Sequence, residues 1–146
     1  MRWLLGLFLF LLAPLALADS CTLTTQAVSF GVYDPLSAVA KTANGSITAV
    51  CNNTPVVIKF SIGGGPTYLA RRMSLGGSTL NYNLYTDAAL SRIWGDGTGG
   101  SFTGGGLVQT GPGRDTVVFP IYGVIPPNQD PGLGLHSDTI VVTMVF

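Results

Sequence analysis

Hydrophobic and polar residues alternate with a period of two along most of the chain, and Gly, Pro, Asn and Asp interrupt the alternation at short intervals. In VVIKFSIG (56–63), Val56, Ile58 and Phe60 fall on one face, and Lys59 falls on the other. The segment LNYNLYTD (80–87) alternates in the same way, and no stretch shows a convincing helical period. Period two is typical of strands with one buried face, so we expect an all-β antiparallel sandwich.

Six strands are predicted, at about 22–31, 45–51, 55–62, 79–86, 115–125 and 137–146. Pro120 interrupts the fifth, because proline cannot donate to a central ladder and marks an edge or a bulge. The last strand is apolar or β-branched on both faces and should lie inside a sheet. An immunoglobulin-like sandwich needs about seven strands, so either a short strand lies in the Gly-rich middle or the sandwich lacks one.

The N-terminus has the three parts of a secretory signal peptide. Arg2 is the positive residue, 4–12 is the apolar run, and Ala16-Leu17-Ala18 is a small-x-small cleavage site. We expect residues 1–18 to be removed and residues 19–146 to form one domain. A membrane anchor would need roughly 20 apolar residues. A lipoprotein acylated at Cys21 would need a small neutral residue where Asp19 stands.

Charge and cysteine content narrow the function classes. Seven Lys and Arg balance seven acidic residues, so the chain lacks the basic field that nucleic-acid binding requires. Cys21 and Cys51 are the two cysteines, and export favours their oxidation to a disulfide. Closing that loop lowers the conformational entropy of the unfolded chain, which stabilises the folded state by about 3–4 kcal/mol. A zinc site is the alternative, but two cysteines and the distant His136 do not form a known zinc spacing.

Catalytic chemistry has little support in the sequence. The chain has no Glu, and its single histidine, His136, lies in the Gly-rich segment GLGLHSD. No motif pairs it with the aspartates Asp34, Asp87, Asp96, Asp115, Asp130 and Asp138. GDGTGGSFTGGG (95–106) lacks the Lys-Ser/Thr of a phosphate-binding loop, and no calcium-loop spacing occurs. We therefore expect no enzyme activity, no cofactor and no metal.

Six segments in order carry a family resemblance. They are FGVYDP (30–35), TPVVIKFSIGGG (54–65), RRM (71–73), LNYNLYTDAALSRIWGDGTGG (80–100), VFPIYGVIPPNQ (118–129) and GLHSDTIVVTMVF (134–146). Together they resemble the spore coat protein U family, which includes subunits of archaic chaperone-usher pili in Gram-negative bacteria. The resemblance spans nearly all of residues 19–146.

The resemblance implies an incomplete immunoglobulin-like sandwich that lacks its last strand. A periplasmic chaperone supplies that strand temporarily, and a neighbouring pilin subunit supplies it permanently after passage through an outer-membrane usher. The expected location is the periplasm and then the cell surface, in a pilus or a coat. The predicted donor-strand groove is lined by Phe60, Ile62, Ile140, Val142, Met144 and Phe146.

One departure from the family pattern concerns position in the fibre. Similar pilins donate an N-terminal extension of roughly a dozen residues, whereas a cut after Ala18 leaves Asp19 and Ser20 before Cys21. We therefore expect a terminal subunit, such as a tip adhesin, or a coat component assembled last. Candidate apolar contacts at the tip are Ile93, Trp94, Leu107, Val108, Leu133 and Leu135, with burial as the alternative for Trp94. The alternative function is a self-complete secreted module that binds a small ligand or carbohydrate.

Overall fold

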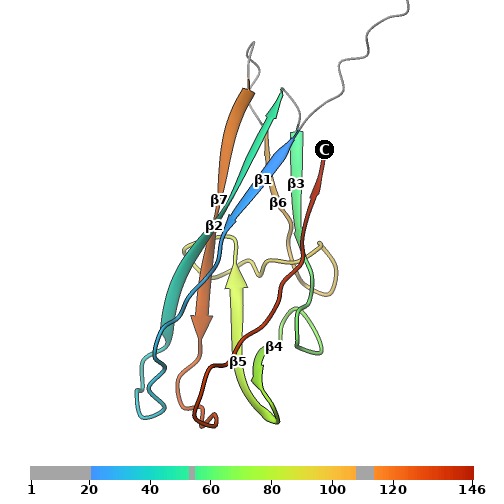
Figure 1. Ribbon diagram of the computed structural model, residues 1–146. Coiled ribbons are helices and arrows are strands. Elements are labelled where there is room, and N and C mark those ends of the chain that lie inside the picture. The colour runs from blue at the N-terminus through green and yellow to red at the C-terminus, as the bar shows by residue number, and fades with distance from the viewer. Residues whose placement is uncertain (1–20, 53–54, 108–113) are drawn as a thin grey trace, which may run out of the picture.

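The computed structural model describes residues 21–52, 55–107 and 114–146, and every regular element in these ranges is a β-strand (Figure 1). The all-β prediction is therefore confirmed. These ranges contain no helix long and apolar enough to cross a membrane. The strands are β1 (Thr22–Gln26), β2 (Lys41–Asn52), β3 (Pro55–Phe60), β4 (Arg71–Leu75), β5 (Ser78–Tyr85), β6 (Gly104–Leu107), β7 (Arg114–Ile125) and β8 (Val142–Val145).

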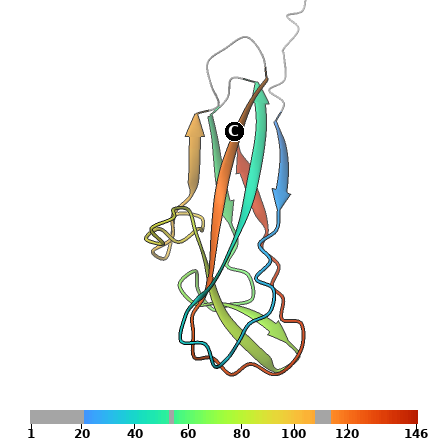
Figure 2. The ribbon, with the colours of Figure 1, turned by 90° about the vertical axis from the view of Figure 1, so that its left-hand side faces the viewer.

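The strands form two antiparallel sheets. One has five strands in the order β1-β2-β7-β5-β4, and the other has three in the order β6-β3-β8. Two views at right angles show an elongated molecule in which the long β2 and β7 run side by side (Figures 1 and 2). The three-stranded sheet faces only the end of this pair that carries β1, and β4 and β5 lie toward the other end.

The core follows from the period-two pattern of the strands. Alternate residues of β3 are buried, and β5 buries Leu80, Tyr82 and Leu84 in the same way. Trp94, from the connection after β5, stacks on Phe60 with ring centroids 4.5 Å apart. The inner faces meet in one cluster: Ile47, Ala49, Cys51, Val56, Ile58, Phe60, Leu80, Tyr82, Leu84, Trp94, Phe119, Ile121 and Ile125.

The predicted number of six strands is too low, because β4 and β6 have no clear alternation in sequence. β6 reads GGGL, yet glycine is required where it packs: a Cβ on Gly104 would lie 1.9 Å from the Trp94 ring. β4 reads RRMSL and begins with Arg71, which is fully buried. Pattern analysis assigns such segments to loops because it scores glycine and arginine as non-strand residues.

The predicted interruption at Pro120 is wrong, since β7 is continuous from Arg114 to Ile125. Pro120 pairs with Ser46 of β2, while the pairing of β7 with β5 begins only at Tyr122. Pro120 therefore lies beyond the end of β5, where a missing N–H removes no bond to that neighbour.

Two predicted strands are shorter in the structure than in the sequence pattern. β1 ends at Gln26 rather than about residue 31, and β8 covers Val142–Val145 rather than 137–146. The prediction that the last strand lies inside a sheet is also not met in the isolated chain, because β8 is at the edge of its sheet. The segments that alternate but have no ladder, 27–31 and 137–141, both line the cavity described next.

Candidate functional site

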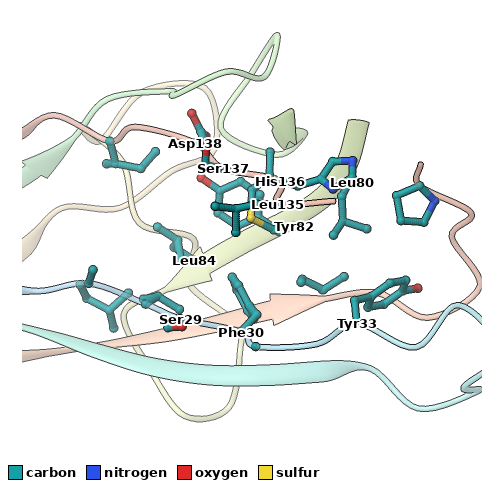
Figure 3. A pocket seen from close by; sticks show the side chains of 18 of the residues that line it. Ser29, Phe30, Tyr33, Leu80, Tyr82, Leu84, Leu135, His136, Ser137 and Asp138 are labelled. Atoms are coloured by element: carbon teal, nitrogen blue, oxygen red, sulfur yellow. The ribbon is translucent and has the colours of Figure 1, made fainter. Parts of the chain in front are cut away.

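An open groove of about 870 Å³ runs between two segments from opposite ends of the chain (Figure 3). We call residues 25–35 the N-terminal wall and residues 131–142 the C-terminal wall. Figure 3 shows Ser29, Phe30 and Tyr33 on one side of the groove and the side chains of residues 135–138 on the other. Eight residues of the sheets form the floor: Ile47, Phe60, Met73, Leu80, Tyr82, Leu84, Ile121 and Ile125.

Both walls continue from strands that lack a second neighbour in the described part of the chain. β1 pairs only with β2, and β8 pairs only with β3. Within the described ranges, residues 27–33 take part in no ladder, and Ser61 alone extends the β3–β8 pairing as far as Val141. Unpaired strand edges present free N–H and C=O groups, so this groove can accept an additional extended segment.

Apolar side chains hold the N-terminal wall against the five-stranded sheet. Val28 and Phe30 pack where β2 and β7 carry Gly45 and Gly123, and a Cβ on Gly123 would lie 2.7 Å from both side chains. The Phe30 ring also meets Tyr82 edge-on at a centroid distance of 6.1 Å. These glycines open the space in which the wall sits.

Polar contacts hold the C-terminal wall, and Asp138 contributes three hydrogen bonds at its centre. Its Oδ1 accepts the backbone N–H groups of Gly64 (2.8 Å) and Thr139 (2.7 Å), and its Oδ2 accepts the Tyr82 hydroxyl at 2.6 Å. Burial, and then the bond to Asp138, raise the pKa of Tyr82 well above its usual value. Tyr82 therefore stays protonated and remains the donor.

Further along the same wall, His136 is bound to the first residue of β5, Ser78. The Nε2 atom of His136 lies 2.8 Å from Ser78 Oγ, and that oxygen accepts the Gly132 N–H at 2.7 Å. Ser137 exchanges backbone hydrogen bonds with Ser74 of β4. The histidine is thus engaged in a structural contact with β5.

Tyr33 connects the N-terminal wall to the segment that leads into the C-terminal wall. Its hydroxyl donates to the Pro126 carbonyl and accepts the Gln129 N–H, each at 3.1 Å. The Gln129 side chain in turn brackets the backbone of Asn81, accepting from its N–H and donating to its carbonyl. These hydrogen bonds therefore link the N-terminal wall to the segment that leads into the C-terminal wall.

A buried arginine supports the floor from the side away from the walls. Arg71 donates to the carbonyls of Ser61, Ile62 and Trp94 and to the side chain of Asn83. Burial lowers the pKa of Arg71, although an arginine stays charged at neutral pH. Sequence analysis did not find this role, because RRM in isolation is typical of an exposed segment.

The predicted groove residues divide into two groups. Phe60, Ile140 and Val142 line the groove, whereas Ile62, Met144 and Phe146 do not. Met144 packs against the core beyond the groove, and Phe146 is 56% exposed at the end of the chain. The prediction omitted the whole N-terminal wall, although the alternation of residues 22–31 indicates an inward-facing row there.

The candidate tip contacts do not form one surface. Trp94 is 1% exposed and cannot contact a partner in this structure, so its inclusion was wrong and burial is its role. The segment that contains Ile93 lies midway along the molecule (Figure 1). Leu133 and Leu135 instead lie on the C-terminal wall, where their side chains are largely exposed. Val108 and the side chain of Leu107 fall outside the described residues.

The predicted disulfide is present. Cys21 and Cys51 are bonded at an S–S distance of 2.05 Å, which links the start of β1 to β2. In the described ranges no three His, Cys, Asp or Glu side chains gather into a group that could hold a metal ion.

Comparisons with known proteins agree with this architecture. The model of the Spore Coat Protein U domain matches residues 7–143. Protein U of Myxococcus xanthus is 31% identical over 135 residues, covering 82% of this chain and 71% of that protein.

One solved structure has a similar fold. It is a chain of the CsuC–CsuE chaperone–tip adhesion subunit pre-assembly complex, from archaic chaperone-usher Csu pili of Acinetobacter baumannii, with a TM-score of 0.64 and 21% identity. The match covers 88% of this chain but only 40% of the solved one. On the family model and the Protein U match, this chain belongs to the Spore Coat Protein U domain family.

Proposed function

We propose that this protein is an exported subunit of a chaperone-usher surface fibre and that its groove receives an extended strand from a partner. The observation that carries the proposal is the pair of strand edges on either side of the groove, each with a neighbour on one side only in the described residues. A strand inserted there gains backbone hydrogen bonds from the edges and buries alternate side chains on the apolar floor.

The sequence pattern supports the same occupant. Exposed and partly buried residues alternate in 27–31 and 137–141 as they do in strands, yet neither segment belongs to a ladder. The outward row of the last strand also includes two exposed valines, Val141 and Val145. An added strand would supply the missing neighbour and explain why the sequence favours strand in both walls.

The family and the fold support the assembly pathway. A periplasmic chaperone would fill the groove before assembly, and a neighbouring subunit would replace it at the outer-membrane usher. The solved complex with a similar fold contains a chaperone and a tip adhesion subunit. We place this protein at a fibre end as well, because the predicted cut after Ala18 leaves Asp19 and Ser20 ahead of Cys21.

A displayed library of peptides of about twelve residues tests the strand-acceptor function, since that length spans a strand of roughly 40 Å. The exported protein should enrich peptides with alternating apolar residues. Val142→Asp, which puts a charge on the groove lining, should abolish the enrichment, because an unpaired charge in an apolar site is strongly unfavourable. Thr143→Asp is the matched control, because Thr143 faces outward.

Circular dichroism and thiol titration should show that both variants are folded and oxidised. Enrichment of non-alternating peptides, or equal enrichment by wild type and Val142→Asp, contradicts strand acceptance. A stable monomer that selects no peptide would instead favour the self-complete ligand-binding module. Immunogold label spread along whole fibres would refute the terminal position alone.

A further inference from the structure

The groove lining carries an acidic side chain, Asp138. Among the described residues that line it, Asp138 is the only Asp, Glu, Lys or Arg, and the others are apolar, glycine, or neutral polar residues apart from His136. A single carboxylate in such a groove exerts a strong effect, because the apolar surroundings weaken screening by solvent.

Within the described part of the chain, the hydrogen bonds of this carboxylate leave its charge uncompensated by a bonded cation. Its partners there are two backbone N–H groups and the Tyr82 hydroxyl, all of which are neutral. The charge of Asp138 acts to raise the pKa of Arg71. The guanidinium of Arg71, however, donates its hydrogen bonds to backbone carbonyls and to Asn83. An ionised carboxylate has about four acceptor positions, so three donors leave capacity for one more.

The position of Asp138 on the wall gives it a defined neighbour in an incoming strand. Residues 138, 140 and 142 are partly buried, while 139, 141 and 143 are exposed, so the first three share the inward face. The inward side chains of a paired strand follow the same spacing of two residues. Two successive inward positions of the incoming strand therefore meet Ile140 and Val142, and the adjacent one meets Asp138.

We propose that Asp138 selects the incoming strand by charge: it excludes an acidic side chain at the facing position and favours lysine, arginine or a neutral hydrogen-bond donor. The inference rests on the proposed strand-acceptor function and specifies the chemistry of the partner strand. The expected pattern is two apolar inward residues with, at one end of the pair, an inward residue that is basic or carries a hydroxyl or amide group. Like-charge juxtaposition supplies the discrimination, since it disfavours wrong partners more than it strengthens the right one.

Synthetic peptides test this selection. The framework is the tightest alternating peptide from the displayed library, and each inward position in turn receives Lys, Gln or Glu. At positions that face apolar residues, Lys and Glu should weaken binding similarly. At the position that faces Asp138, peptides with Lys or Gln should bind about tenfold more tightly than the peptide with Glu. The difference should shrink in high salt.

Asp138→Asn keeps the shape of the side chain and removes its charge, so it should abolish the Lys-to-Glu difference at that position. Asp130→Asn is the matched control, because Asp130 is an exposed aspartate nearby that does not line the groove. Tyr82→Phe frees one acceptor position on Asp138 and should increase the preference for Lys.

A Lys-to-Glu ratio that is the same in wild type and Asp138→Asn overturns the charge selection while leaving strand acceptance intact. Failure of every alternating peptide to bind wild type refutes strand acceptance and, with it, this inference.

Discussion

The two walls of the groove are attached to the same sandwich by different physical means. Val28 and Phe30 hold the N-terminal wall by filling space above Gly45 and Gly123. Asp138 and His136 hold the C-terminal wall through directed hydrogen bonds to β5 and the Gly64 segment. Apolar packing tolerates small shifts, whereas hydrogen bonds fix direction and register.

This difference suggests a division of roles for an incoming strand. The C-terminal wall is the fixed template, with its inward row set by polar contacts, and the N-terminal wall is the side that adjusts. Substitutions that weaken one wall at a time should separate the two roles.

The largest effect is expected from removing the disulfide that fixes the start of the N-terminal wall. Cys51→Ser breaks the bond to Cys21 and should lower the free energy of unfolding by about 3–4 kcal/mol, because the unfolded chain regains a loop of 30 residues. Denaturant unfolding and periplasmic yield measure the loss. A Cys21→Ser/Cys51→Ser double variant controls for mispaired thiols, and two free thiols in the exported wild type would contradict the prediction.

The second effect acts on the space beneath the same wall. Gly123→Ala places a methyl group against Val28 and Phe30 and should destabilise the protein by about 1–3 kcal/mol through overpacking. Gly105→Ala is the control, because a Cβ there meets no atom within 4 Å. Amide hydrogen exchange should increase in residues 27–33 and not in 137–141. Equal change in both walls would mean that they do not respond separately.

How far the sequence predicted these walls depends on the kind of contact. Alternation predicted that 27–31 and 137–141 are strand-like and that Ile140 and Val142 face inward, since period two depends on each segment alone. The contacts of Asp138 with Gly64 and Tyr82 could not be predicted, because they join residues far apart in the chain. β6 was missed for a related reason: Gly104 is explained only by Trp94 packing on it.

A third effect tests the C-terminal wall. Tyr82→Phe removes the 2.6 Å bond to Asp138 and should lower the free energy of unfolding by about 1.5 kcal/mol, as for a hydrogen bond to a charged group.

Tyr82→Phe should also change how the free energy of unfolding depends on pH. The folded-state pKa of Tyr82 is raised, so its contribution is complete below about pH 10, where unfolded tyrosine is still protonated, and declines above it. The variant should lose stability less steeply between about pH 10 and 11, and an unchanged alkaline slope would contradict the raised pKa of Tyr82.

The smallest effect on stability is expected at Tyr33, which links the N-terminal wall to the segment before the C-terminal wall. Tyr33→Phe removes a donor to Pro126 and an acceptor for Gln129, and these partly exposed bonds should be worth about 1 kcal/mol together. The local effect should be larger than the global one, because the N-terminal wall loses its link to residues 126–129. Hydrogen exchange should rise at Gln129 and in residues 30–33, while Asp138 keeps the C-terminal wall in place. Tyr122→Phe is the control, since Tyr122 lies in β7 away from both walls. If exchange in residues 137–141 rose as much as in 30–33, the C-terminal wall would depend on Tyr33, and it could not serve as the fixed template for an incoming strand.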